Sequence, residues 1–472
     1  MRNGLKWIAA FAAAVMIEGT GAGSVQASGA EWEEWTDSSG VQYAGYRKDG
    51  VIHGMGEAVY ANQSKYTGTF TDGRREGTGE CEWPSGDRFQ GEYSQGKRNG
   101  LGIYISTADA DDYGQQSGMG TRYEGEYVND RRDGLGYYRW ADGTYYIGEW
   151  TDGEWNGLGI VFYADGGRQA GVWQDGELQP EGQKEEWTDA AGNLFIGDRS
   201  GDTINGKGIA IYKSGRCYVG DFAGGQIDGR GIFLWEHGDR YIGDFQDGKC
   251  HGKGLCVWNV HEQYEAYLGE YREGVLSGTG ILYLRNGGRY EGQFQNTMRD
   301  GKGMLYFANG DRFDGSWTED RKNGPGSYYY RDGSVLMGEW KEGALEGYAL
   351  ICGADGSLDP GYWEKGTRAE NGAQLWTSGD TQYFGIQENG TLQGKGIAIE
   401  GEAASCRIGE FETGSFRTGT IFMNQSRYEG TCQEGAWMEG WQYFYDRYGK
   451  LYGIPFANGM PGETAEDPGS LK

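Results

Sequence analysis

One 23-residue pattern recurs along most of this chain and outweighs any single motif. Each unit starts with an aromatic residue, any residue, Gly, any residue and a second aromatic residue. Glycines follow at positions 8, 12, 14 and 21, and another aromatic residue stands at position 18. Tyr66, Gly68 and Phe70 start one unit, and Phe89 starts the next, 23 residues after Tyr66. A fixed period of this length is typical of a repeat array, in which each unit contacts its neighbours.

The unit starts divide the chain into runs. They stand at Tyr43, Tyr66, Phe89, Tyr123, Tyr146, Gln169, Phe195, Tyr218, Tyr241, Tyr267, Tyr290, Phe313 and Leu336. Less regular units follow near Tyr383, Arg407 and Tyr428. Trp35, Trp187 and Trp376 each precede a run. We therefore predict three sub-arrays over residues 28–182, 183–365 and 366–453, with a disordered tail over 454–472.

The glycine and aromatic content indicates strands. The 472 residues include 90 Gly but only 7 Pro, and 14% of them are aromatic. Long helices are not expected, because each Gly in a helix interior costs roughly 1 kcal/mol. Short runs of β-branched and aromatic residues between glycine-containing turns are typical of strands. Each unit has room for two strands and two turns, so we predict an all-β fold of consecutive β-hairpins.

The spacing within a unit assigns side chains to the two faces of the sheet. Alternate residues of a strand point to opposite faces, so positions 1, 3 and 5 share one face. The glycine at position 3 leaves room for neighbouring rings to lie over the backbone. Position 4 points the other way and is often acidic, at Glu92, Glu126, Glu149, Asp198, Asp221, Asp244, Glu270, Glu339 and Glu410. Asp-Gly pairs at positions 7–8 and 20–21 suit turns that need a positive φ.

The second strand is mostly apolar on both faces between Phe195 and Tyr330. The candidate binding residues are those at positions 15 and 17, namely Ile209, Ile211, Ile232, Leu234, Leu255, Val257, Ile281, Tyr283, Met304 and Tyr306. A strand that is apolar on both faces needs cover on both, and no predicted helix can supply it. Two interpretations stay open: the sheet curves over itself, or the stripe is exposed as a binding groove or dimer face.

The charge argues against polyanionic partners. A net charge of −27 disfavours nucleic acid and anionic membrane surfaces. Basic turns such as Arg74-Arg75 and Arg131-Arg132 are flanked by acids, and we expect them to be solvated.

No catalytic or metal-binding set of residues stands out. Neighbouring position-4 acids would lie roughly 9.6 Å apart by strand spacing, and no pair is singled out, which favours a solvated row over a glycosidase pair. Cys250, His251, Cys256 and His261 are zinc-ligand types, but the repeat places Cys250 and His261 in opposite turns, roughly 18 Å apart. We predict no enzyme activity, no cofactor and no metal site.

Residues 1–27 have the composition of a secretory signal peptide. Arg2 and Lys6 form a basic start, an apolar stretch runs from Trp7 to Ile17, and small residues precede a cleavage point near Ala27. The apolar stretch is short for a membrane span. We predict a secreted or cell-surface protein.

The seven cysteines are predicted to be unpaired despite this predicted export. Cys81 and Cys256 share position 16 in distant units, and equivalent sites in neighbouring hairpins would be roughly 9.6 Å apart. A disulfide needs Cα atoms about 4.4–6.8 Å apart. Most of the cysteines are therefore expected to act as small apolar side chains.

The repeat consensus resembles the MORN (membrane occupation and recognition nexus) repeat. Tyr123-Glu124-Gly125-Glu126-Tyr127, followed by Gly134, Gly136, Trp140 and Gly143, matches it closely. The resemblance implies an elongated, twisted antiparallel sheet of consecutive hairpins, in two or three sub-arrays. Proteins similar to this serve as scaffolds, dimerisation modules and membrane- or lipid-associated tethers. Some also carry a lipid kinase or lysine methyltransferase domain, to which nothing in this sequence corresponds.

These observations predict a non-catalytic extracytoplasmic scaffold. It would bind a protein partner or itself through an aromatic-rich sheet surface, by repeated weak contacts. A cell-wall polysaccharide binder is one alternative, because Tyr and Trp are abundant. A membrane lipid-surface tether is another, although the charge opposes it.

Overall fold

The computed structural model describes residues 31–48, 50–107, 120–179, 184–400, 405–423, 426–433, 436–445, 451–457 and 460–461. Every regular element in these ranges is a strand, and the strands form three sheets, within each of which consecutive strands pair antiparallel. The predicted all-β fold of consecutive hairpins in sub-arrays is therefore confirmed. The predicted signal peptide lies outside the described residues.

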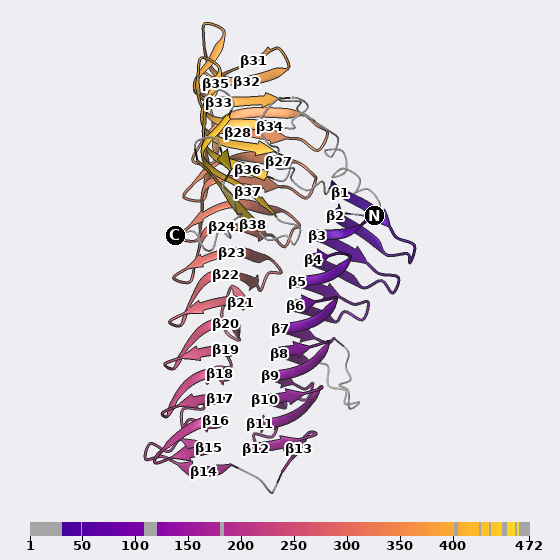
Figure 1. Cartoon of the computed structure of the whole chain (residues 1–472), viewed down its shortest axis with the longest axis vertical. Coiled ribbons are helices and arrows are strands. Elements are labelled where there is room, and N and C mark those ends of the chain that lie inside the picture. Colours follow the sequence, from indigo (N-terminus) through magenta and orange to yellow (C-terminus); the bar gives the residue numbers. More distant parts are fainter. Residues whose placement is uncertain are drawn as a thin grey trace. The chain divides into compact units, whose positions relative to one another are not determined.

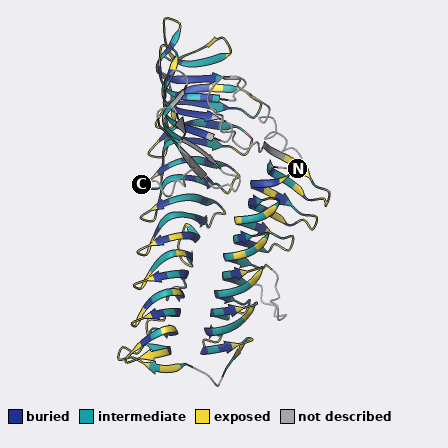
Figure 2. Ribbon diagram, viewed as in Figure 1, coloured by how far each residue is buried: buried dark blue, intermediate teal, exposed yellow. Residues whose placement is uncertain are grey.

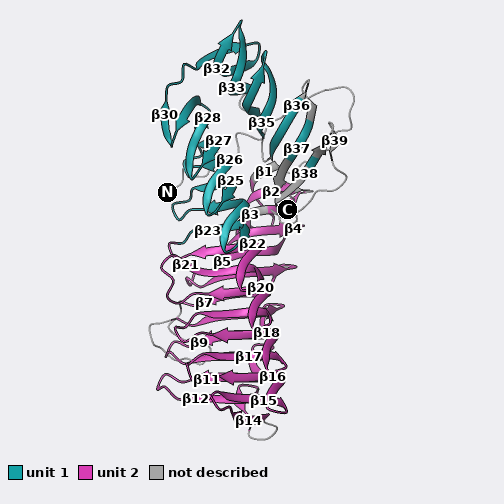
Figure 3. Ribbon diagram, turned by 90° about the vertical axis from the view of Figure 1, so that its left-hand side faces the viewer, with its two compact units in different colours: residues 1–33, 287–472 teal, residues 34–286 magenta. Residues whose placement is uncertain are grey.

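The chain divides into two compact units, one of residues Glu34–Asn286 and the other of residues Met1–Glu33 together with Gly287–Lys472 (Figure 3). The unit Glu34–Asn286 contains two runs of strands, which Figure 1 labels in order. The first sheet consists of β1 (Glu31–Thr36), β2 (Gln42–Lys48), β3 (Val51–Val59), β4 (Lys65–Thr71), β5 (Arg74–Glu82), β6 (Arg88–Ser94), β7 (Lys97–Ile105), β8 (Arg122–Val128), β9 (Arg131–Arg139), β10 (Tyr145–Thr151), β11 (Glu154–Phe162), β12 (Arg168–Gln174) and β13 (Glu177–Leu178). The second run, called here the second sheet, consists of β14 (Glu185–Thr188), β15 (Leu194–Ser200), β16 (Thr203–Ile211), β17 (Cys217–Ala223), β18 (Gln226–Leu234), β19 (Arg240–Gln246), β20 (Lys249–Val257), β21 (Tyr264–Arg272) and β22 (Val275–Leu284).

The other unit also contains two runs of strands. The first is β23 (Arg289–Gln295), β24 (Met298–Tyr306), β25 (Arg312–Thr318), β26 (Arg321–Tyr329), β27 (Val335–Lys341), β28 (Ala344–Cys352), β29 (Leu358–Glu364) and β30 (Thr367–Ala369). The second is β31 (Gln374–Ser378), β32 (Thr381–Glu388), β33 (Thr391–Glu400), β34 (Ser405–Glu412), β35 (Ser415–Met423), β36 (Ser426–Gln433), β37 (Ala436–Tyr445), β38 (Leu451–Ala457) and β39 (Met460–Pro461). Strand structure thus extends past residue 454, where the sequence predicted a tail, and residues 462–472 lie outside the described ranges. The predicted domain limits themselves stay a prediction.

Each hairpin repeats one register. In the β10–β11 pair, Tyr146 faces Val161, Gly148 faces Gly159, and the register shifts between Gly148 and Trp150. The same shift falls between positions 3 and 5 in most units. It is a β-bulge, which adds an unpaired residue and increases the local twist. The bulge brings the position-4 side chain across its own hairpin, where Glu149 Oε2 accepts the Leu158 amide at 2.8 Å.

The two turns of a unit differ in geometry. At positions 7–8 both residues have positive φ, as at Asp152 (53°) and Gly153 (100°). At positions 20–21 only the glycine does, as at Gly143 (93°). There Asp142 instead uses its carboxylate to accept the Thr144 amide at 2.8 Å. Asp therefore has two roles in one repeat. At position 7 its backbone adopts a positive φ, and at position 20 its carboxylate accepts a hydrogen bond within the turn.

The two sheets of the Glu34–Asn286 unit pack against each other. Their shared core contains Leu101, Ile103, Ile147, Leu158 and Ile160 from the first sheet, and Ile209, Val219, Ile232, Ile242 and Leu255 from the second. These residues occupy positions 2, 13 and 15, so they share the face opposite to positions 1, 3 and 5. Figure 2 shows the buried residues alternating with more exposed ones along these strands. The unit is thus a two-layer β-sandwich with an inner apolar face and an outer aromatic face.

The other unit repeats this arrangement on a smaller scale. Leu350 and Cys352 from β28 share a core with Ile397, Ile399 and Ile408 from β33 and β34. At its border, Lys302 Nζ donates to Glu429 Oε1 at 2.7 Å.

Candidate binding surface

The predicted binding stripe lies mostly in the core. Eight of its residues are at most 8% exposed and face the first sheet, namely Ile209, Ile211, Ile232, Leu234, Leu255, Val257, Ile281 and Tyr283. Met304 and Tyr306, in the other unit, are half-buried. The eight buried residues are therefore corrected from candidate binding residues to core residues. The reason is that the first sheet supplies the cover that no helix could.

The acidic row at position 4 is not solvated in the first sheet. Glu92, Glu126 and Glu149 form ion pairs with Lys253, Arg230 and Lys207 of the second sheet. The three glutamates are 14–22% exposed, so the prediction of a solvated row is wrong there. Burial raises the pKa of Glu126, against the opposing influence of Arg230.

The basic partners of this row were missed at the sequence level. Lys207, Arg230 and Lys253 stand at position 13, between two glycines, where the first sheet has Leu101, Leu135 and Leu158. The contrast is visible in the sequence. However, these basic residues meet the acids only if the two sub-arrays face each other in opposite directions. The repeat does not specify that arrangement.

One ion pair in this interface is completely buried. Glu124 is 0% exposed and bonds to Arg122 of its own sheet and Arg240 of the second sheet. Although burial opposes ionisation, Arg240 and Arg122 hold the pKa of Glu124 below its ordinary value. Arg240 also stacks over the Tyr137 ring, 4.4 Å from its centroid. The cluster is a polar anchor inside an apolar core, and removal of one partner would leave a buried charge.

The outer face of each sheet carries a continuous layer of rings. Tyr146 at position 1 meets Trp150 edge-on at 5.5 Å and 86°, and Trp173 at 6.1 Å and 88°. Edge-to-face contacts of this kind are favourable aromatic geometries. The Tyr146 hydroxyl donates to the Glu149 carbonyl at 3.1 Å, which gives a reason for Tyr at position 1. A Cβ on Gly159 would lie 2.1 Å from that hydroxyl, so the ring requires the glycine.

Arginines at position 10 are inserted between these rings in the first sheet. Arg75 lies 4.7 Å from the Tyr93 centroid, Arg98 lies 5.0 Å from that of Tyr127, and Arg132 lies 4.7 Å from that of Trp150. The flanking acids predicted that the basic turns are solvated. This is correct for Arg131, whose side chain is 63% exposed. It is wrong for Arg75 and Arg132, which are half-buried. The second sheet has aliphatic or thiol side chains at the same position, namely Ile204, Ile227, Cys250 and Leu276.

A groove of about 560 Å³ crosses the outer face of the first sheet. Its walls include Tyr60 and Trp83, which stand at position 18 of successive units, and Arg75 and Arg98, which stand at position 10. Cys81, at position 16, lies in its lining. The volume is within the range of ligand-binding sites.

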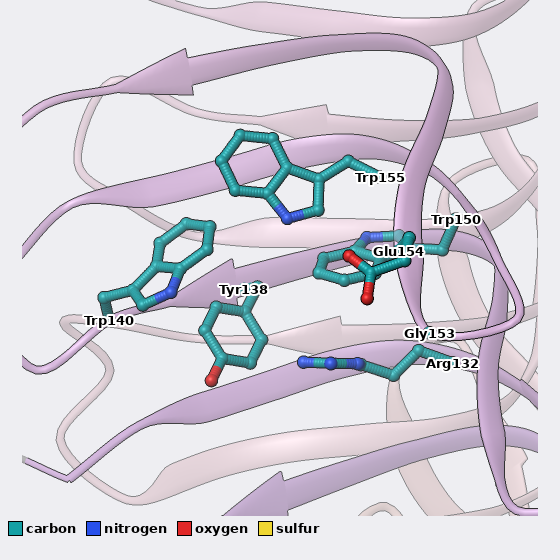
Figure 4. Close-up of a pocket in the computed structure, with 7 residues that line it drawn as sticks. All are labelled: Arg132, Tyr138, Trp140, Trp150, Gly153, Glu154 and Trp155. Atoms are coloured by element: carbon teal, nitrogen blue, oxygen red, sulfur yellow. The ribbon is translucent and has the colours of Figure 1, made fainter. Parts of the chain in front are cut away.

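The groove lies where position 16 carries a small side chain. The next two units have Tyr104 and Tyr138 at position 16 in place of Cys81. Around Tyr138 the hollow shrinks to about 10 Å³, and Figure 4 shows this side chain beside Trp140, with Arg132 directed between Tyr138 and Trp150. Two side chains therefore distinguish the two places: Tyr138 stands where the groove has Cys81, and Trp155 stands where it has Arg98.

The two arginines of the groove differ in their partners. Arg98 Nε lies 3.3 Å from Asp130 Oδ1 at the rim. Arg75 donates to the Gly96 carbonyl at 2.5 Å, and no carboxylate among the described residues forms an ion pair with it. The groove thus holds a half-buried cation that forms no ion pair with a described carboxylate, beside apolar ring surfaces.

The candidate zinc ligands do not form a cluster. No group of three or more His, Cys, Asp or Glu suited to a metal ion occurs within the described ranges. His261 stacks on Tyr264 with 4.2 Å between centroids, and burial raises the pKa of Cys250 to about 12. Where the chain is described, no helix is long and apolar enough to cross a membrane.

A family model of the MORN repeat matches eleven segments, at residues 43–65, 66–88, 89–107, 123–145, 146–168, 218–240, 241–261, 267–289, 290–312, 313–335 and 337–358, which together make up more than half of the chain. Among curated proteins no significant match was found.

Similar solved structures include a TCP domain and a TCP10 domain. One is the TCP domain of Drosophila melanogaster SAS-4 in complex with a proline-rich motif of Ana2, at 16% identity and a TM-score of 0.23, with 38% of this chain and 88% of that chain covered. Another is the wild-type TCP10 domain of Danio rerio CPAP, at 12% identity and a TM-score of 0.11, with 60% of this chain and 98% of that chain covered.

The repeat matches indicate the general function of the chain. MORN repeats usually take part in protein or membrane interactions, and the family is generally non-enzymatic. With more than half of its length in matched repeats and the remaining units folded into the same kind of hairpin, this chain belongs to the MORN repeat family.

Proposed function

We propose that this protein is a non-catalytic, extracytoplasmic scaffold that binds another protein through the outer face of its first sheet. The groove between Tyr60, Trp83, Arg75 and Arg98 is the observation that carries the proposal. Interaction surfaces are enriched in aromatic residues and arginine, and side chains held rigidly lose little entropy on binding. Here the rings and guanidinium groups already hold one another in place.

The inner face is not part of this proposal, because its apolar residues are used to hold the sandwich together. The outer face of the first sheet is covered by its own rings, because the buried cluster on that face contains only first-sheet residues among those described. A partner would therefore add to this layer without opening the core.

The extracytoplasmic part of the proposal rests on residues 1–27. Their basic start, apolar stretch and small residues near Ala27 support export and cleavage. Fractionation of cells, followed by N-terminal sequencing of the mature chain, tests this part. A chain that keeps Met1 and stays in the cytoplasm contradicts it.

Photo-crosslinking tests the binding role. A benzophenone amino acid replaces Tyr60, at the groove, or Tyr330, which stands at the same repeat position in the other unit and is 38% exposed. We expect protein adducts of defined mass from the groove position and few from the control. The proposal fails if neither position yields a protein adduct while the purified chain binds cell-wall polysaccharide or anionic vesicles saturably.

A further inference from the structure

We propose that the groove on the first sheet binds an acidic, proline-rich segment of a partner protein in the polyproline II conformation. This inference rests on the proposed protein-binding role and adds the chemistry of the partner segment. Three features carry it: the spacing of the groove walls, their apolar character, and the charge of Arg75.

The groove walls repeat at the distance of one hairpin. Tyr60 and Trp83 are 23 residues apart in sequence, and so are Arg75 and Arg98. Successive hairpins add two strands, so equivalent side chains lie roughly 9.6 Å apart across the sheet. A ligand that runs across the strands therefore meets the same pair of side-chain types, an aromatic ring and an arginine, once every repeat.

Polyproline II is the peptide conformation that matches this distance. It has three residues per turn and a rise of about 3.1 Å per residue, so one turn spans roughly 9.3 Å. An α-helix has a pitch of about 5.4 Å and would present different faces to successive repeats. A β-strand returns to the same face after two residues, roughly 6.8 Å. Only the polyproline II peptide keeps one face on the groove at every hairpin.

The walls suit proline rings better than sugar hydroxyl groups. Aromatic grooves recognise polyproline segments because the rigid peptide loses little entropy when it binds. A glycan needs several free hydrogen-bonding groups, and among the buried side-chain atoms of this groove only the Tyr93 hydroxyl is without a described partner. In this groove the Asn62 side-chain oxygen already accepts from the Ser64 amide at 3.0 Å and from its hydroxyl at 2.6 Å. Arg98 is likewise bonded to Asp130.

The charge of Arg75 calls for an acidic residue in the ligand. Its guanidinium stacks on Tyr66 and Tyr93 and makes no ion pair with a carboxylate of the described chain. A carboxylate in the groove would form a charge-assisted bond with it, which is stronger than a neutral one. The net charge of −27 opposes an acidic ligand at long range. However, charges beyond about 8 Å are largely screened at physiological ionic strength.

Fluorescence anisotropy with the full chain tests this inference. The probe is a labelled peptide of three Pro-Pro-Glu repeats. Three Gly-Ser-Glu repeats keep the charge without the conformation, and three Pro-Pro-Lys repeats keep the conformation with the opposite charge. We expect saturable binding of the first peptide, and at least about ten-fold weaker binding of the other two.

Two variants locate the site. Cys81→Tyr fills the groove with the residue that the next two units carry at position 16, so the repeat is known to accommodate it. We expect it to abolish binding. Arg75→Gln should weaken binding about ten-fold. Arg131→Gln makes the same charge change on an exposed turn of the same sheet and should leave the affinity within about two-fold.

The outcomes separate this inference from the proposed function. If the Gly-Ser-Glu peptide binds equally well, or if the Pro-Pro-Glu peptide does not bind, the inference is wrong. If Cys81→Tyr abolishes binding of an anionic oligosaccharide or a vesicle instead, the groove has a different occupant and the inference is also wrong. Protein adducts at Tyr60 that persist when the peptide fails leave the proposed function intact.

Discussion

The two sheets of the Glu34–Asn286 unit share one repeat but differ at positions 10 and 13. At position 10 three units of the first sheet carry Arg75, Arg98 and Arg132, and the second sheet carries apolar residues. At position 13 the relation is reversed: three units of the first sheet carry leucine, and three units of the second carry Lys207, Arg230 and Lys253. Basic residues therefore point outward in the first sheet and towards the first sheet's acids in the second.

This difference separates the residues that form the hairpin in both sheets from the residues that give each sheet its own surface. The position-1 ring and the glycines at positions 3 and 14 are used in the same way in both sheets, as at Tyr146 and Tyr218. Positions 10, 13 and 16 vary without disturbing the hairpin register. A repeat array can therefore acquire a charged interface or an open groove by single substitutions on an unchanged backbone.

The largest expected effect concerns the buried charge that joins the two sheets. Glu124→Leu removes the partner of Arg240, which is only 9% exposed. An unpaired buried charge typically costs about 3–5 kcal/mol. The free energy of unfolding from urea titration of the full chain should fall by this amount. A loss below about 1 kcal/mol would mean that Glu124 does not anchor the interface.

A feature that both sheets share gives the next effect. Gly159→Ala in the first sheet and Gly231→Ala in the second each place a Cβ about 2.1–2.2 Å from a tyrosine hydroxyl oxygen. Overpacking of this kind costs about 1–3 kcal/mol. We expect similar losses of unfolding free energy in both variants. A loss confined to one sheet would contradict the view that the ring layer is built identically in both.

The charged layer between the sheets should give a smaller effect. Lys253→Leu gives the second sheet the residue type that the first sheet carries at position 13, and leaves Glu92 without its partner. Because Lys253 is 55% exposed, we expect a loss of at most about 1 kcal/mol that shrinks as salt is added.

A double-mutant cycle isolates this ion pair. Glu92→Gln keeps an acceptor for the Leu101 amide, which Glu92 binds at 2.9 Å, and removes the charge. A coupling free energy of zero between the two substitutions at low salt would show that the pair does not hold the sheets together.

A pH dependence is also expected, at position 10 of the other unit. Burial, followed by the nearby Arg299, lowers the pKa of Lys322 to about 8, from 10.5 in a free side chain. Between pH 8 and 10 the unfolded chain therefore binds more protons than the folded one, so the contribution of Lys322 makes stability rise with pH. Below pH 8 both states are protonated and this contribution is flat.

Replacement of this lysine by an apolar residue gives position 10 the character that it has in the second sheet, and tests whether Lys322 causes the pH dependence. Lys322→Met cannot titrate, so the rise in unfolding free energy between pH 8 and 10 should be smaller than in the parent chain. Denaturant titrations at half-unit pH steps measure it. An unchanged slope would mean that Lys322 is protonated in the folded state throughout this range.

Sequence periodicity predicted the hairpins well and the site poorly. The period of 23 placed rings, glycines and turns correctly, because these depend on contacts within a hairpin and with the next one. It could not decide whether the stripe from Ile209 to Tyr283 was exposed or covered. That depended on the first sheet, whose residues lie more than 50 positions away in sequence, as for Ile209 and Ile147.

The groove illustrates the same limit on the outer face. Cys81 was predicted to be a small apolar side chain, and it is buried as such. That its small size leaves a hollow follows only when Tyr60, Arg75, Trp83 and Arg98 are placed around it. A comparison of position 16 among units, Cys81 against Tyr104 and Tyr138, was the sequence signal that could have located it.

The sequence alone determined the hairpin, its register and its membership of a repeat family, because a 23-residue unit contains both strands and both turns. The tertiary structure decided which face became core, which acids met which bases, and where a hollow stayed open. These outcomes depend on the packing of one sub-array against another, and a pattern repeated in every unit does not encode that arrangement.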